Sequence, residues 1–166
     1  MPNHLERLSI FSKYFKPEDK IYDSNIYKRW VISGLAQAIP QLFHNHHVIL
    51  VANDLYRDLD RRWNLNGSFT HVQIDKGMSQ RFRNHILDRC RESINKKIMS
   101  DSSFPVVFFQ AGSLAPWLII RLFKEYPNVF YIDMGQALNF WFMDKPELLR
   151  AHWMQVYKPI LMRHFE

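Results

Sequence analysis

The chain has 166 residues, a formal net charge of +6 and a single cysteine, and 47% of its residues are hydrophobic. A chain of this length and apolar content can bury a full core, so we expect one globular domain and exclude a mostly disordered protein. Because Cys90 has no second cysteine, no intrachain disulfide can form, and a structural zinc held by cysteines is not expected.

The N-terminus and the charge pattern bear on location and partners. The first residues lack the apolar core of a signal peptide, and no run approaches the roughly 18 apolar residues of a membrane span. We therefore expect a cytoplasmic protein without a membrane span. The basic residues form small, scattered clusters, as on solvated helix faces, so nucleic acid is not the expected partner. A basic surface that attracts phosphate-bearing ligands or acidic lipids is the alternative.

Apolar spacing and turn residues predict alternating helices and strands. The strongest helix signal is a stripe of apolar residues spaced four apart between Met78 and Ile98. In chain order, the predicted elements are a helix over 5–15, a helix from 24 or 25, a strand over 48–53, a helical turn over 54–63, a strand over 71–75, a helix over 78–98, a strand over 106–110, a helix over 113–125, a strand over 129–133, and helices over about 136–143 and 146–163.

The runs over 48–53, 106–110 and 129–133 are apolar, rich in β-branched and aromatic residues, and too short for helices. Such runs are typical of strands buried on both faces of a parallel sheet. With helices between them, they predict an α/β, Rossmann-like three-layer domain with a mostly parallel sheet of about four strands. The single domain over 1–166 divides into an N-terminal helical extension (1–23), a core (24–143) and a C-terminal helix (144–166).

Polar or small residues follow each predicted strand. The carboxyl ends of parallel strands meet at one edge of a sheet, where ligands bind in α/β folds, so these residues are the predicted rim of a cleft. They are Asn53 and Asp54, Asp75, Gln110, Gly112 and Ser113, and Asp133, Gly135 and Gln136.

The residues after the third and fourth strands suggest specific chemistry. Gly112 allows close approach to the backbone, and Ser113 stands where a helix N-terminus can hold a phosphate. The alternative is a tight turn followed by a helix cap. Asp133 can bind a hydroxyl, hold a metal or act as a base, or it caps the next helix. Gln136 and Asn139, three apart on that helix, could present amides to the same cleft.

The order of five segments resembles the GT-D-type glycosyltransferases, bacterial enzymes that transfer sugars from nucleotide-sugar donors on a Rossmann-like fold. The resemblance covers roughly residues 24–143 and depends on the Asn-Asp-Leu and Ile-Asp-x-Gly signatures. The segments are Tyr27–Trp30, Val48–Leu55, His71–Asp75, Val106–Gly112 and Tyr131–Gly135.

The resemblance implies a nucleotide-sugar site lined by Asn53, Asp54, Gly112, Asp133 and Gly135. It implies transfer to an acceptor that the sequence does not identify, with Asp133 and Asp54 as the catalytic candidates. Gly112 and Ser113 would then hold the diphosphate.

Two departures from the family pattern leave the cofactor and the activity open. The resemblance implies Mn²⁺ or Mg²⁺ beside the nucleotide sugar, but the family's metal-binding Asp-x-Glu has no counterpart here. The acidic run that usually follows Asp-x-Gly is replaced by Gln136–Trp141. The alternative is therefore a non-catalytic Rossmann-like module that acts through a protein partner. A second copy or another subunit would then cover an edge of the sheet.

Overall fold

The computed structural model describes residues 31, 34–75, 81–101, 104–144, 147–148, 151–152 and 154–155. The predicted helix over 5–15 and Met78 of the predicted apolar stripe lie outside the described residues, as does most of the predicted helix from 24 or 25. The last part of the predicted helix over 146–163 also lies outside them.

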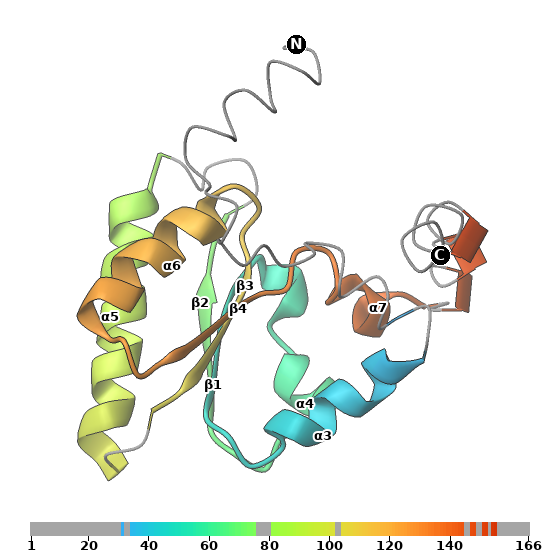
Figure 1. Ribbon diagram of the computed structural model, residues 1–166, viewed down its shortest axis with the longest axis horizontal. Coiled ribbons are helices and arrows are strands. Elements are labelled where there is room, and N and C mark those ends of the chain that lie inside the picture. The colour runs from blue at the N-terminus through green and yellow to red at the C-terminus, as the bar shows by residue number, and fades with distance from the viewer. Residues whose placement is uncertain are drawn as a thin grey trace, which may run out of the picture.

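The described elements alternate between helices and strands (Figure 1). Two of them, η1 and η2, are 3-10 helices. In chain order they are η1 (Leu35–Ala38), α3 (Ile39–Phe43), β1 (Val48–Ala52), η2 (Asp54–Tyr56), α4 (Leu59–Trp63), β2 (Phe69–Gln73), α5 (Arg83–Asp101), β3 (Val106–Gln110), α6 (Leu114–Glu125), β4 (Phe130–Asp133) and α7 (Asn139–Phe142).

The four strands form one sheet in the order β2-β1-β3-β4, and every pairing is parallel. All residues of β1 are buried, and so are the first four residues of β3, Val106–Phe109. Both strands pair on both sides and are covered on both faces. The predicted α/β, Rossmann-like fold is confirmed.

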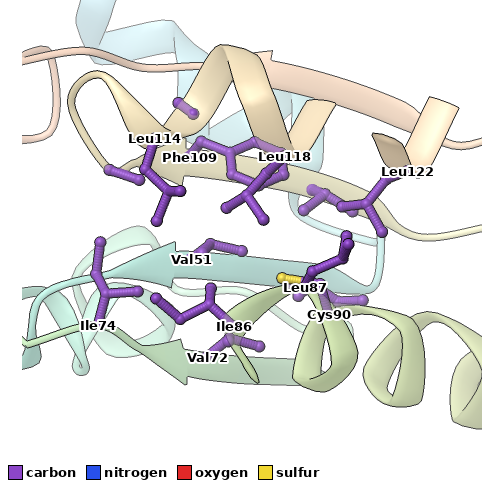
Figure 2. Close-up of a cluster of buried hydrophobic side chains, with 14 of the residues drawn as sticks. Val51, Val72, Ile74, Ile86, Leu87, Cys90, Phe109, Leu114, Leu118 and Leu122 are labelled. Atoms are coloured by element: carbon purple, nitrogen blue, oxygen red, sulfur yellow. The ribbon is translucent and has the colours of Figure 1, made fainter. Parts of the chain in front are cut away.

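Helices cover the two faces of the sheet differently (Figure 1). On one face, α5 and α6 enclose a mainly aliphatic cluster, which also contains Phe109 and which we call the aliphatic cluster. Figure 2 shows Leu114, Leu118 and Leu122 of α6 on one side of Val51, with Cys90 of α5 on the other. On the opposite face, α3, α4 and the segment around α7 pack with an aromatic cluster that includes Trp63, Phe108 and Trp141.

The fourth strand differs from the prediction. The run ending at Asp133 is predicted to be buried on both faces, but β4 lies at the edge of the described sheet, where β3 is its one neighbour among the described strands. Its first residue, Phe130, is 71% exposed. The predicted apolar stripe of α5 is confirmed at Ile86, Cys90 and Ile94, which are buried, whereas Phe82 precedes the helix and is 44% exposed.

Candidate functional site

The strand order places the ends of β1 and β3 side by side. Ala52 and Gln110, the last residues of these strands, are register partners. After β1 the chain turns to the face that carries α4, and after β3 it turns to the face that carries α6. In open α/β sheets, neighbouring strands whose connections diverge in this way leave a crevice beyond their carboxyl ends. The candidate site is this switch point.

The turn after β3 forms one side of the switch point. Gly112 has a positive φ of 55°, and an added Cβ at this residue would meet no other atom within 4 Å. The backbone of Gly112 therefore borders open space and is accessible to a ligand. Ser113 follows it as the exposed N-cap residue of the 12-residue helix α6.

The N-terminus of α6 offers fewer amide donors than the sequence suggested. The N–H groups of Leu114 and Ala115 donate to the carbonyls of Ala111 and Gly112, at 3.2 and 3.1 Å. Pro116 has no N–H group to donate. A phosphate at this turn would therefore depend on the exposed backbone of Gly112 and the positive end of the helix dipole, and not on the amides of Leu114 and Ala115.

The residues after β1 form the other side of the switch point. The side-chain oxygen of Asn53 accepts a hydrogen bond of 3.0 Å from the amide of Leu55 and so caps η2. Asp54 is exposed and pairs with Arg57 at 3.4 Å. The carboxylate of Asp54 is exposed to solvent, whereas the side-chain oxygen of Asn53 is already engaged in capping η2.

The two other predicted carboxylates, Asp75 and Asp133, do not lie at the switch point between β1 and β3. Asp75 follows β2 and Asp133 ends β4, and these strands lie at opposite edges of the sheet. Three strand spacings separate the edges, which amounts to roughly 14 Å. The carboxylate of Asp133 accepts a 2.9 Å hydrogen bond from the amide of Gly135, and Asp75 accepts one of 3.3 Å from Gln73. Gln136 is exposed.

The structure thus brings Asn53, Gln110, Gly112 and Ser113 to two adjacent strand ends. Asp133 lies one strand further on, because it pairs in register with Phe109 of β3. These positions do not fit a divalent cation. In the part of the chain that the structure describes, no three His, Cys, Asp or Glu side chains are grouped so that they could hold a metal ion.

Tyr56, Gln110 and Asn139 form a hydrogen-bonded polar trio that the sequence did not predict. Asn139 of α7 accepts hydrogen bonds through Oδ1 from the hydroxyl of Tyr56 at 2.5 Å and from Nε2 of Gln110 at 3.1 Å. Burial raises the pKa of Tyr56 above its ordinary value, and a hydrogen bond with the Gln110 side chain partly opposes this shift. The hydrogen bonds of the trio thus connect η2, β3 and α7 next to the switch point.

A cleft of about 680 Å³ lies away from the strand ends, between α3, α4 and the segment around α7. Arg62 donates a 2.7 Å hydrogen bond to the carbonyl of Trp141, and its guanidinium lies 4.4 Å from the ring centre of Phe142. The ring of Trp63 meets that of Trp141 edge-on at 5.0 Å. Within the described residues, Nε1 of Trp63 is buried without a hydrogen-bond partner.

Comparisons with known proteins give no relative: no family model, no curated protein and no solved structure matches the chain. Among the helices that the structure describes, none is both long and apolar enough to cross a membrane.

Proposed function

We propose that this protein is a cytoplasmic, glycosyltransferase-like protein that binds a nucleotide-sugar donor at the β1–β3 switch point and transfers the sugar to an acceptor. The observation that carries the proposal is the diverging pair of strand ends at Asn53 and Gly112. Ligands of α/β proteins bind in such crevices. The resemblance of the motifs supports the class of ligand.

Each rim residue has a distinct part in this proposal. The backbone at Gly112 and Ser113 would contact the diphosphate, because the space above Gly112 is open. Asp133 and Asp54, both exposed, are the candidates for the base that takes a proton from the acceptor hydroxyl. Asn53 and Gln110 would orient the ligand from the central strand ends.

Calorimetry with UDP, GDP, UDP-glucose and GDP-mannose tests the site. We expect saturable binding of at least one of these ligands without added metal. Gly112→Asn should weaken it at least tenfold, because asparagine tolerates a positive φ and its side chain fills the open space. A folded Gly112→Asn protein with unchanged affinity, or no heat with any nucleotide, would overturn the proposal.

The catalytic part needs its own measurement. Slow release of UDP or GDP from the bound sugar nucleotide reports turnover when the acceptor is unknown. Asp133→Asn should reduce this release at least a hundredfold while nucleotide affinity changes little. Asp60→Asn, the same change on α4, is the matched control and should leave release unchanged. Equal rates of nucleotide release in both variants would show that Asp133 is not the base.

An assembly module is the second candidate, and the apolar surface beside β4 favours it. A cavity of about 310 Å³ is lined entirely by apolar residues of α3, β3, β4 and their flanks. Leu42, which lines the cavity, is 67% exposed, and Phe130 at the start of β4 is 71% exposed. In this candidate a second copy covers the edge of β4.

Light scattering separates the two candidates. The assembly module predicts a dimer that Leu42→Glu converts to a monomer, whereas Met99→Glu, at an 86% exposed position on α5, leaves it intact. A monomeric wild-type protein would contradict this candidate.

A further inference from the structure

A groove of about 500 Å³ runs between α5 and the outer edge of β2. β2 is the first strand in the sheet order, so among the strands that the structure describes β1 is its only neighbour. Five consecutive residues at the edge, 68–72, line one wall, and polar residues of α5 between Arg89 and Ser100 line the other. The groove is thus bordered by strand backbone on one side and by helix side chains on the other.

The backbone of β2 presents hydrogen-bonding groups to this groove. Toward β1, the carbonyl of Ser68 accepts from Val48 at 3.0 Å and the amide of Ile74 donates to Ala52 at 2.9 Å. Backbone groups alternate in direction along a strand, so the odd-numbered residues Phe69, His71 and Gln73 face outward. Arg89 confirms this direction, because its Nη1 donates to the carbonyl of Gln73 at 3.0 Å. No strand in the described part of the chain pairs with this edge, so the outward groups of Phe69 and His71 can accept an added strand.

The charges along the helix wall are mainly positive. Arg89, Lys96 and Lys97 line the groove, and Glu92 is the one carboxylate among the residues that form it. Arg89 and Lys96 are seven residues apart on α5, a rise of roughly 11 Å. In an extended strand, side chains four residues apart lie on one face at about 13 Å. The positive charges therefore match acidic residues along an extended chain.

A compact phosphate ligand fits this groove less well. Its cations are spread over two helical turns instead of converging on one point. The hydroxyls of Ser93 and Ser100 donate to carbonyls of their own helix, at 2.9 and 2.8 Å. On the other wall, Ser68 is hydrogen-bonded to His47. Few hydroxyls are left to surround a phosphate.

We propose that the β2–α5 groove binds an acidic, extended peptide segment of a partner protein by strand addition to β2. The outward groups of Phe69 and His71 pair with the peptide backbone, and Arg89, Lys96 and Lys97 attract its carboxylates. This groove lies along a strand edge and not at the strand ends, so the proposal is independent of nucleotide-sugar binding.

Fluorescence anisotropy with a labelled seven-residue peptide of alternating glutamate and valine tests the groove. We expect micromolar binding that Lys96→Glu weakens at least tenfold by reversing a charge in the wall. Lys124→Glu makes the same charge change on the exposed surface of α6 and should leave the affinity within twofold. A peptide with lysine in place of glutamate should not bind.

Strand addition has a separate test. Methylating the peptide nitrogens that would donate to β2 should abolish binding without changing the charge of the peptide, and NMR should show shifts at the amides of Phe69 and His71. Equal binding of the methylated peptide, equal weakening by Lys96→Glu and Lys124→Glu, or tighter binding of an oligonucleotide would overturn the proposal. Nucleotide calorimetry on Lys96→Glu should match the wild type.

Discussion

The two faces of the sheet are built differently. The face under α5 and α6 is mainly aliphatic, with Phe109 as its one fully buried aromatic residue among those described, and these helices are 19 and 12 residues long. The opposite face is covered by α3 and α4, of five residues each, and by large aromatic rings. The clefts of about 680 and 310 Å³ both adjoin the second face. Long helices with branched side chains cover the centre of one face, whose groove of about 500 Å³ lies at its outer edge beside β2, while short helices and rigid rings leave hollows over the other face.

The two faces of the sheet have different roles. The aliphatic face provides stability by removing apolar surface from water. The aromatic face carries the polar trio of Tyr56, Gln110 and Asn139 and ends at the switch point. A ligand that enters at the strand ends would lie next to the face that carries the polar trio.

Two adjacent phenylalanines of β3 provide the most direct test of this comparison. Phe108 and Phe109 are both 0% exposed, but Phe109 points into the aliphatic cluster and Phe108 into the aromatic one. Phe109→Ala should lower the free energy of unfolding by about 4–5 kcal/mol, and Phe108→Ala by about 3 kcal/mol. The smaller effect is expected because Phe108 already borders a cavity. Urea denaturation measures both.

Phe123→Ala is the control for these variants, since Phe123 is 55% exposed on α6 and its loss should change stability by less than about 1 kcal/mol. If Phe108→Ala destabilises the protein as much as Phe109→Ala, the two faces are equally well packed and the comparison fails.

Cys90 tests how well the aliphatic face excludes water. Burial raises the pKa of its thiol to about 12. Between pH 9 and 12 the unfolded chain loses the thiol proton while the folded chain keeps it, so stability falls as the pH rises. Urea unfolding at pH 8 and 10.5 should show a loss about 2 kcal/mol greater in the wild type than in Cys90→Ala. Parallel losses in the two proteins would mean that water reaches Cys90.

The hydroxyl of Tyr56 tests the polar trio on the other face. Tyr56→Phe removes the 2.5 Å hydrogen bond to Asn139 and should lower the free energy of unfolding by about 1 kcal/mol. Because Asn139 begins α7, amide exchange should quicken in α7. Tyr131→Phe is the matched variant on the aliphatic side, where the hydroxyl donates to the carbonyl of Tyr126 at 3.1 Å. Equally fast exchange of α7 in both variants would show that the trio does not hold this helix.

Much of the fold follows from local sequence patterns. The central strands were predicted within a residue, because an uninterrupted apolar run leaves a short buried strand as the main possibility. The spacing of Ile86, Cys90 and Ile94 likewise identified the buried side of α5. The place of β4 at an edge could not be predicted, since Phe130 has the same character as a core residue and strand order depends on the whole sheet.

The candidate site was predictable only in part. Parallel strands put their exits on one edge, so the rim residues could be named from the sequence. The distance between Asp75 and Asp133 depends on the strand order, which motif spacing does not contain. The contact of Tyr56 with Asn139 joins residues 83 apart in the chain, and Tyr56 looks like an apolar core residue in its segment.

The smallest expected effect concerns the ion pair that joins α5 and α6 outside the aliphatic cluster. The guanidinium of Arg91 donates through Nε and Nη2 to the carboxylate of Glu125, at 2.8 and 2.5 Å, and through Nη1 to Asp88. Both side chains of the interhelical pair are more than a third exposed, so solvent screens the pair. Glu125→Gln should therefore lower the free energy of unfolding by about 0.5 kcal/mol, and Glu92→Gln, the control on α5, by less.

The pH and salt dependence of this pair completes the comparison of the two faces. Arg91 lowers the pKa of Glu125, so the pair's contribution is present above the ordinary carboxyl pKa and is lost as the pH falls through the lowered value. Raising the ionic strength should reduce the difference between Glu125→Gln and the wild type. A difference that persists in high salt, or that approaches the effect of Phe109→Ala, would mean that α6 is held by its charges more than by its leucines.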